Sequence, residues 1–228
     1  MSGTTSPKQA ATQGIALGFI AGYVDTVGFV ALFGLFTAHV TGNFVLIGSE
    51  LASPSSGVLI KFLAFFTFVL AVALTRLAVL WLERSGKPVL LALYLIEAAL
   101  LLLFLAFGTL ARPVTDAGAP LALLAGAAAA AAMGVQNAGS RLVLQQLVPT
   151  TVMTGNVTQL VIDWVDIARG AADEVVRARS SKFFWPIVAF ALGAIGGAFA
   201  YAWVAFLALA LPIAALLWLC VGERQARA

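Results

Sequence analysis

Two identical polar triplets stand out in this otherwise apolar chain of 228 residues. Their residues are Thr41, Gly42 and Asn43 in the first copy and Thr154, Gly155 and Asn156 in the second, 113 positions later. Glycine weakens a helix interior by about 1 kcal/mol relative to alanine, and asparagine competes for backbone hydrogen bonds. Each triplet therefore predicts a point where a helix breaks or restarts, with Thr41 or Thr154 capping the helix that follows.

Broken backbone offers binding groups for small ions. Freed N–H groups and the helix dipole favour an anion, and freed carbonyl groups favour a cation. At membrane depth such backbone is tolerated only if it is buried in protein or faces a water-filled cavity. The alternative is close packing, in which the glycine lets helices approach and its polar neighbours bond across them.

Ionisable residues inside apolar runs are the second group of candidates, because a charge within a membrane has to face the protein interior or a partner. Asp25 stands near the middle of the first run and Glu97 near the middle of the third. We expect Asp25, aided by Glu97 and Arg141, to bind substrate or a coupling proton. The alternative is purely structural, with Asp25 and Glu97 in ion pairs with Arg76 and Arg141.

Polar residues near the triplets complete the candidate site. Asn137 aligns with Asp25, so one half carries an acid where the other carries an amide. His39, the only histidine, precedes Thr41 by two residues and has the chemistry to titrate near neutral pH and gate an entrance. A hydrogen-bonded structural role is the alternative. Gln136, next to Asn137, adds to a polar helix face.

Enzyme signatures are missing from the sequence. It contains no Walker loop, no HExxH, no GxSxG and no cluster of cysteine and histidine with metal-ligand spacing. We therefore expect no enzymatic activity, no metal and no cofactor. The net charge of +3 is spread between apolar runs rather than gathered in a patch, so no nucleic-acid partner is expected.

Composition predicts an integral membrane protein. The chain is 62% hydrophobic and 10% charged, with a mean hydropathy of +1.03, whereas soluble domains are about 25% charged. Six runs are long enough to span a bilayer. They cover residues 14–35, 58–82, 88–108, 121–147, 183–201 and 204–222. The triplet-containing stretches 36–51 and 149–165 are shorter, so they either enter partway or add two further crossings.

Positive charges favour six crossings over eight. Lys and Arg in short loops favour the cytoplasmic side. With six spans and a cytoplasmic N-terminus, nine of the thirteen basic residues lie inside, and only Lys61 and Arg112 lie in outer loops. The nine are Lys8, Arg84, Lys87, Arg169, Arg177, Arg179, Lys182, Arg224 and Arg227. Both termini are then cytoplasmic.

The resulting fold is all-α, a single membrane domain over 1–228 with six transmembrane helices in two inverted three-helix repeats. Repeat 1 covers about 14–108 and repeat 2 about 121–222. Three spans per half reverse the second half relative to the first, the arrangement of many transporters. The alignment of residues 21–25 with 133–137 places Gly22 on Gly134. Residues 61–68 likewise resemble residues 182–190.

The strings "GYVDTVGFVALFGLFTAHVTGNFVLIG" from residue 22 and "MGVQNAGSRLVLQQLVPTTVMTGNVTQL" from residue 133 resemble the YoaK-like family of bacterial membrane proteins. The resemblance implies a multi-spanning protein of the bacterial inner membrane. It implies no substrate and no catalytic residues.

These features predict a small secondary transporter of an unknown small solute, with its site between the two repeats. Proton coupling through Asp25 is part of that hypothesis. The alternatives are a passive channel and a non-transporting scaffold that binds a partner protein. The expected partners are the lipid bilayer and the solute, and the small size of a six-span unit favours a homodimer.

Overall fold

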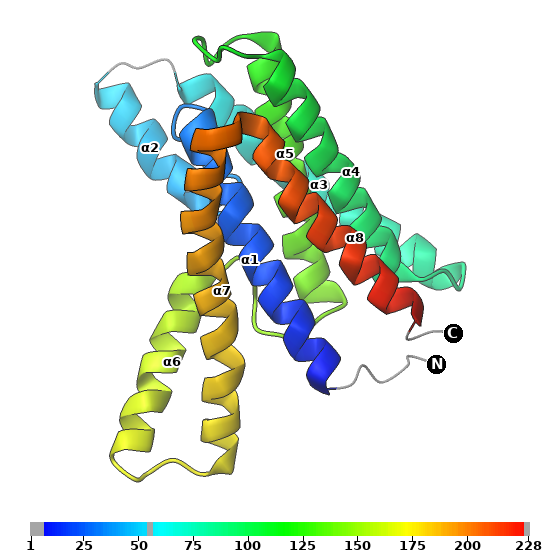
Figure 1. Cartoon of the computed structure of the whole chain (residues 1–228), viewed down its shortest axis with the longest axis vertical. Coiled ribbons are helices and arrows are strands. Elements are labelled where there is room, and N and C mark those ends of the chain that lie inside the picture. The colour runs from blue at the N-terminus through cyan, green and yellow to red at the C-terminus, as the bar shows by residue number, and fades with distance from the viewer. Residues whose placement is uncertain (1–6, 54–56, 226–228) are drawn as a thin grey trace.

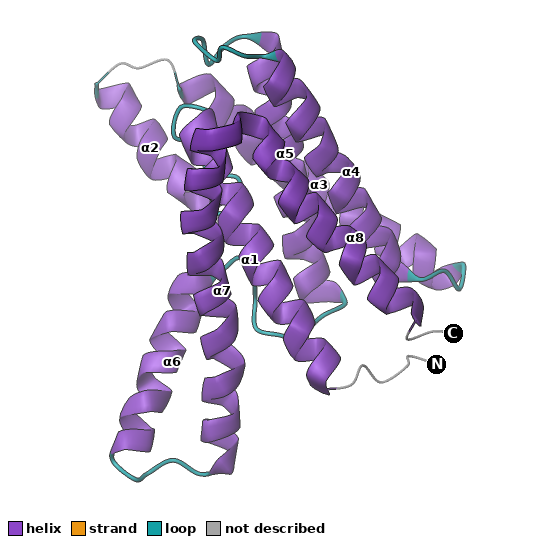
Figure 2. Cartoon of the chain, viewed as in Figure 1, coloured by secondary structure: helices purple, strands orange, loops and turns teal. Residues whose placement is uncertain are grey.

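The computed structural model describes residues 7–53 and 57–225, which form helices joined by loops, with no strand among them (Figure 2). Arg227, counted above among the inner basic residues, lies outside these ranges. The elements are α1 (Pro7–Ala31), α2 (Val40–Ala52), α3 (Val58–Arg84), α4 (Val89–Leu110), α5 (Pro120–Leu142), α6 (Met153–Ala168), α7 (Glu174–Val204), the 3₁₀ turn η1 (Ala205–Leu209) and α8 (Ala210–Gln225).

Five helical stretches are long and apolar enough to cross a membrane, which makes this a multi-pass membrane protein. The last of them, Glu174–Gln225, has 52 residues and contains α7, η1 and α8. The chain folds back at η1, so α8 runs down beside the bundle after α7 has run up (Figure 1). Tyr23 of α1 fixes this turn by donating its hydroxyl to the Ala208 carbonyl at 3.0 Å.

Two expected spans end earlier than their apolar runs. The first helix ends at Ala31 rather than 35, because Phe33 and Gly34 adopt left-handed backbone, with φ of 54° and 73°. The fourth expected span ends at Leu142 rather than 147. The non-helical residues that follow, 32–39 and 143–152, are here called the first and second bends, and they lead into α2 and α6.

The two short helices start near the middle of the molecule and run to opposite ends (Figure 1). Helix α2 has 13 residues and α6 has 16, which at 1.5 Å per residue is about 20 and 24 Å, less than the roughly 30 Å of a bilayer core. Each returns to the end of the molecule at which its bend began.

Long helices of one half pack against long helices of the other half. Helix α1 packs mainly against α7, and α3 against α5. At the first crossing, a Cβ on Gly22 would collide with the Phe190 carbonyl, and one on Gly193 with the Phe19 carbonyl. At the second crossing, a Cβ on Gly134 would lie 3.1 Å from the Phe68 carbonyl. The aligned glycines thus meet aligned phenylalanines.

Gly22→Ala should destabilise the protein by about 1–3 kcal/mol, because the added methyl has to push two helix backbones apart. Detergent-solubilised protein, unfolded by heat or denaturant, provides the measurement. Gly48→Ala in α2 is the matched control, since nothing lies within 4 Å of its new Cβ, and alanine there is expected to be neutral or to stabilise by up to about 1 kcal/mol. Equal effects of the two substitutions would contradict the close crossing.

Each short helix is tied to the next long helix by an ion pair. Lys61 of α3 donates to Glu50 of α2 at 2.7 Å, and Arg179 of α7 contacts Asp163 of α6 at 2.6 Å. The assignment of Lys61 to an outer loop was therefore wrong: it lies within α3 and is fully buried, because its amino group finds both a carboxylate and the Phe33 carbonyl. That carbonyl belongs to the left-handed turn that ends α1.

Candidate functional site

The first turns of α2 and α6 meet around a cavity of about 370 Å³, here called the central pocket. Its lining comes from equivalent positions of the two halves, four in residues 38–41 and four in residues 151–154, which are 113 positions apart. The full lining is Ala38, His39, Val40, Thr41, Phe68, Asn137, Thr151, Val152, Met153 and Thr154. The two bends and the starts of both short helices therefore share one space.

The triplets lie inside the first turns of α2 and α6 and do not break a helix themselves. The break precedes them, in the two bends. Expected capping by Thr41 or Thr154 is wrong, because the N-cap residues are His39 and Val152, and neither makes a side-chain cap bond. The two N-caps have similar backbone, with φ of −90° and −114° and ψ of 58° and 68°. Both threonines are exposed and line the central pocket.

The glycines of the two triplets differ in their surroundings. A Cβ on Gly42 would lie 2.9 Å from the His39 ring and 3.0 Å from the Phe36 ring. Nothing lies within 4 Å of a Cβ built on Gly155. Close approach therefore explains the glycine of the first copy and not that of the second.

The asparagines of the triplets hold the bends. The Asn43 side chain donates to the Phe36 carbonyl at 2.7 Å and accepts from the Phe36 N–H at 3.0 Å. The Asn156 side chain donates to the Pro149 carbonyl at 2.7 Å. Each partner lies seven residues before its asparagine, and proline has no N–H for the second bond. Both asparagines are buried and fix the backbone that borders the central pocket.

Asp25 anchors the first bend. Its Oδ1 accepts hydrogen bonds from the backbone N–H groups of Thr37 at 2.6 Å, Ala38 at 2.7 Å and His39 at 3.4 Å. The expected pairing with Arg141 is wrong, since Arg141 is exposed and neither ion pair found among residues 7–53 and 57–225 includes Asp25. Backbone N–H groups of the non-helical bend just before α2 replace the arginine as partners of the carboxylate.

In the second half, neutral amide side chains anchor the equivalent of the bend that a carboxylate anchors in the first half. Asn137 donates to the Thr151 hydroxyl at 2.5 Å, and Gln136 donates to the Thr150 hydroxyl at 2.9 Å. Both threonines belong to the second bend. Asp25 and Asn137, aligned from the sequence, are thus both tied to the bend that follows their helix, with Asn137 also lining the central pocket.

Glu97 lies apart from the central pocket. It is 1% exposed, on α4, and lines a small internal cavity between α4 and α5. The alternative of internal ion pairs with Arg76 and Arg141 is wrong as well, because both arginines are exposed and the two ion pairs of the described chain join other residues. Long arginine side chains can instead reach out of the bundle.

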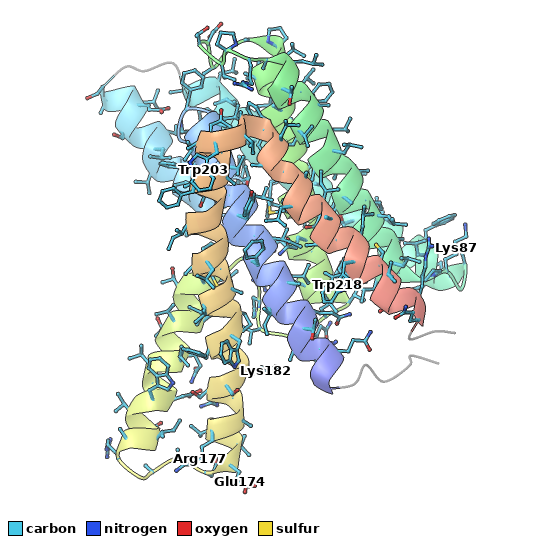
Figure 3. All side chains as sticks on the ribbon, in the orientation of Figure 1. Lys87, Glu174, Arg177, Lys182, Trp203 and Trp218 are labelled. Carbon is cyan, nitrogen blue, oxygen red and sulfur yellow. The ribbon has the colours of Figure 1, made fainter. Side chains whose placement is uncertain are left out.

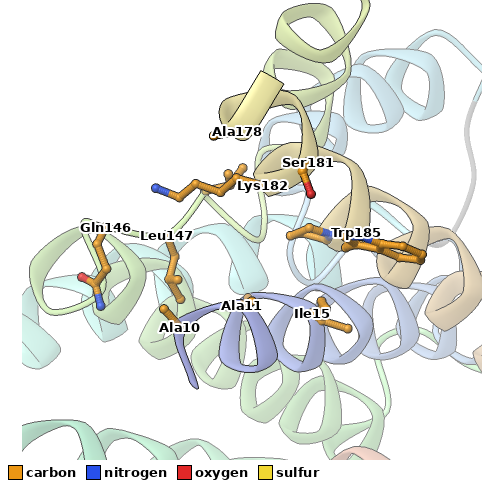
Figure 4. Close-up of a pocket in the computed structure, with 12 residues that line it drawn as sticks. Ala10, Ala11, Ile15, Gln146, Leu147, Ala178, Ser181, Lys182 and Trp185 are labelled. Carbon is orange, nitrogen blue, oxygen red and sulfur yellow. The ribbon is translucent and has the colours of Figure 1, made fainter. Parts of the chain in front are cut away.

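A larger cavity of about 620 Å³ lies elsewhere, between the start of α1, the second bend and α7 (Figure 4). Its lining is mostly alanine, leucine and other apolar side chains, with Gln146, Ser181 and Lys182 as polar residues. It contains none of the residues predicted for the site. Size alone therefore does not select it, and the central pocket, with lining from both halves, is the better candidate.

Sequence reasoning missed the acids of the short helices. Glu50 and Asp163 are also 113 positions apart, each seven residues after the asparagine of its triplet. The signal was therefore in the sequence, as a repeat longer than three residues. Lys61 was missed because a lysine close to the start of an apolar run resembles a charge of the preceding loop.

The central pocket suits a small polar solute. Hydroxyls of Thr41, Thr151 and Thr154 and the amide of Asn137 supply neutral hydrogen-bonding groups, and His39 is the one titratable group in the lining. In the part of the chain that the structure describes, no cluster of three metal-ligating side chains occurs.

Comparisons with known proteins identify a family for nearly the whole chain. A family model described as "Protein of unknown function (DUF1275)" matches residues 13–222. No curated protein and no solved structure matches the sequence.

Proposed function

Because the chain belongs to the DUF1275 family of unknown function, the family that the YoaK-like resemblance indicated, we propose a function for this protein from the geometry of its central pocket. It is a small secondary transporter without enzymatic activity, and it moves a small polar solute through the central pocket. The pocket lies where two re-entrant helices start, which is where many transporters with inverted repeats place their binding sites.

Inverted repeats are part of this proposal. Helices α1 to α4 form one repeat and α5 to α8 the other, with six crossings made by α1, α3, α4, α5, α7 and α8. Three matched features support it. The first two are the exchanged packing of α1 with α7 and α3 with α5 and the aligned glycines at both crossings. The third is the pair of asparagines that each donate a hydrogen bond to a carbonyl seven residues earlier.

We place both termini in the cytoplasm of a bacterium, with the protein in its inner membrane. The two ends of the described chain lie at the same end of the bundle (Figure 1). Arg177 and Lys182 lie on the lower part of α7 and Trp203 lies near its upper end, whereas Lys87 lies at the right edge of the view, in the loop between α3 and α4 (Figure 3). This distribution of basic residues is the one that the positive-inside rule requires.

The shared lining of the central pocket carries the functional assignment, and it predicts water access to both triplets. With Cys220 replaced by alanine, Thr41→Cys and Thr154→Cys should react with a charged, membrane-impermeant thiol reagent in liposomes. Ala129→Cys is the control for a dry interior, because Ala129 is fully buried. We expect at least a tenfold faster reaction at the two pocket positions than at residue 129.

Protection of both threonine positions to the level of residue 129 would contradict transport and favour a scaffold. Where the pocket positions do react, electrical recording separates the transporter from the channel. A channel gives passive, voltage-driven current in liposomes, whereas a secondary transporter gives none without its second solute.

A further inference from the structure

A small internal cavity lies between α4 and α5, beside Leu17 of α1. Its volume is about 10 Å³, close to the least that one water molecule needs, roughly 10–15 Å³. Its polar lining residues are Tyr94 and Glu97 from α4 and Gln136 and Ser140 from α5. Tyr94 and Glu97 are three residues apart, so they share one face of their helix.

Three buried atoms in this cavity have no hydrogen-bond partner: Tyr94 Oη, Glu97 Oε1 and Gln136 Oε1. The cavity lining brings all three together. A single water molecule has the matching groups, since it can accept from the tyrosine hydroxyl and donate one hydrogen to each of the other two oxygens. Three hydrogen bonds are the usual number for a buried water.

Neither ion pair of the described residues includes Glu97, and no basic side chain lines its cavity. The titratable groups around it are Tyr94 on its own helix and Cys220, Glu223 and Arg224 on α8, and the cavity lining from α5 is neutral. An unpaired carboxylate in such a site is costly, whereas a protonated carboxyl is neutral and can also donate a hydrogen bond. The site therefore binds a proton in preference to leaving Glu97 charged.

The cavity is connected to the central pocket by Gln136. Its Nε2 donates to the Thr150 hydroxyl and to the Leu17 carbonyl, both at 2.9 Å. Thr150 lies in the second bend, next to Thr151, which lines the central pocket. Gln136 also lines the small cavity, where its buried Oε1 has no partner, so one side chain touches both the cavity and the bend.

We propose that this cavity is a proton-binding site, in which Glu97 carries the proton, one water joins it to Tyr94 and Gln136, and Gln136 links its occupancy to the second bend. As a coupling site it rests on the proposed transport function; as a proton site it stands without it.

Infrared spectroscopy of the purified full-length protein at pH 7 tests the site without any substrate. We expect the carbonyl band of a protonated carboxylic acid, sensitive to exchange into D₂O, in the unmodified protein. Glu97→Gln should lose that band, whereas the matched control Glu223→Gln on α8 should keep it. Tyr94→Phe, which removes one partner of the water, should shift the band without abolishing it.

Two outcomes would overturn the proposal: no such band in the unmodified protein, or an undiminished band in Glu97→Gln. Glu97→Gln preserves side-chain shape, and the shift in Tyr94→Phe provides a second reading if that variant does not fold. Because this measurement is independent of solute movement, its failure leaves the thiol-labelling test of the central pocket standing. Failure of the labelling test likewise leaves the proton site standing.

Discussion

Replacing Lys61 with methionine should destabilise the protein by about 3–5 kcal/mol, because it breaks a buried ion pair from one side. Lys61 is 0% exposed, and its amino group serves both Glu50 at 2.7 Å and the Phe33 carbonyl at 2.7 Å. The substitution leaves Glu50 without its cation and the end of α1 without its donor. Equilibrium unfolding in mixed detergent, followed by tryptophan fluorescence or circular dichroism, measures the loss.

The double variant Lys61→Met with Glu50→Leu is the control for this effect. Removal of both charges eliminates the uncompensated carboxylate, so we expect most of the lost stability to return. The Phe33 carbonyl remains without its lysine, so recovery should be incomplete by about 1 kcal/mol. A double variant as unstable as Lys61→Met alone would show that the ion pair is not the source of the effect.

Asp25→Ala should cost roughly 3 kcal/mol, the second largest loss. Asp25 is 7% exposed, and its Oδ1 serves three consecutive backbone N–H groups of the first bend. Each buried donor left without a partner costs about 1–3 kcal/mol, and water entering from the central pocket offsets part of the sum. The same unfolding measurement applies.

Two further variants separate anchoring from ion pairing at Asp25. Asp25→Asn keeps an oxygen acceptor and loses only the charge, so we expect a loss of about 1 kcal/mol. Arg141→Gln should change stability by less than about 0.5 kcal/mol, because Arg141 is exposed. If Arg141→Gln matched Asp25→Ala, the ion pair predicted from the sequence would be right and the anchoring role wrong.

Length of apolar runs was enough to predict the middle helices. The runs 58–82 and 88–108 became α3 (Val58–Arg84) and α4 (Val89–Leu110) almost unchanged. Charged residues are few in these runs, with Lys61 and Arg76 in the first and Glu97 in the second. Helices of this kind are set locally, by hydrophobicity and by the length that a bilayer demands.

The ends of α1 and α5 could not be predicted in the same way, because they depend on contacts from elsewhere. Hydropathy continues past Ala31, but the chain turns there, where Lys61 holds the Phe33 carbonyl and Asp25 holds the amides of residues 37–39. Both partners are distant from the turn along the chain. A helix-propensity scale scores each residue by its type and does not include such contacts.

The spacing of residues in the sequence identified the candidate site better than it identified the partners of the charged residues. The 113-residue offset correctly paired positions that now line one cavity, including Thr41 with Thr154. Arg141 stands four residues after Asn137 and so shares a helix face with it, but the sequence does not say which helix that face meets. Opposite charge alone therefore suggested an Asp25–Arg141 pair, where the folded chain supplies backbone donors.

The exchanged packing of α1 with α7 governs the order in which this protein can be assembled. Helix α1 is synthesised first, yet the glycine-lined surface that carries Gly18 and Gly22 meets its partner only after residues 174–204 have been made. Until then the close-packing face of α1 lies in the lipid without its partner helix. The packing of the first helix against α7 is therefore a late step of assembly, which has to follow synthesis of residues 174–204.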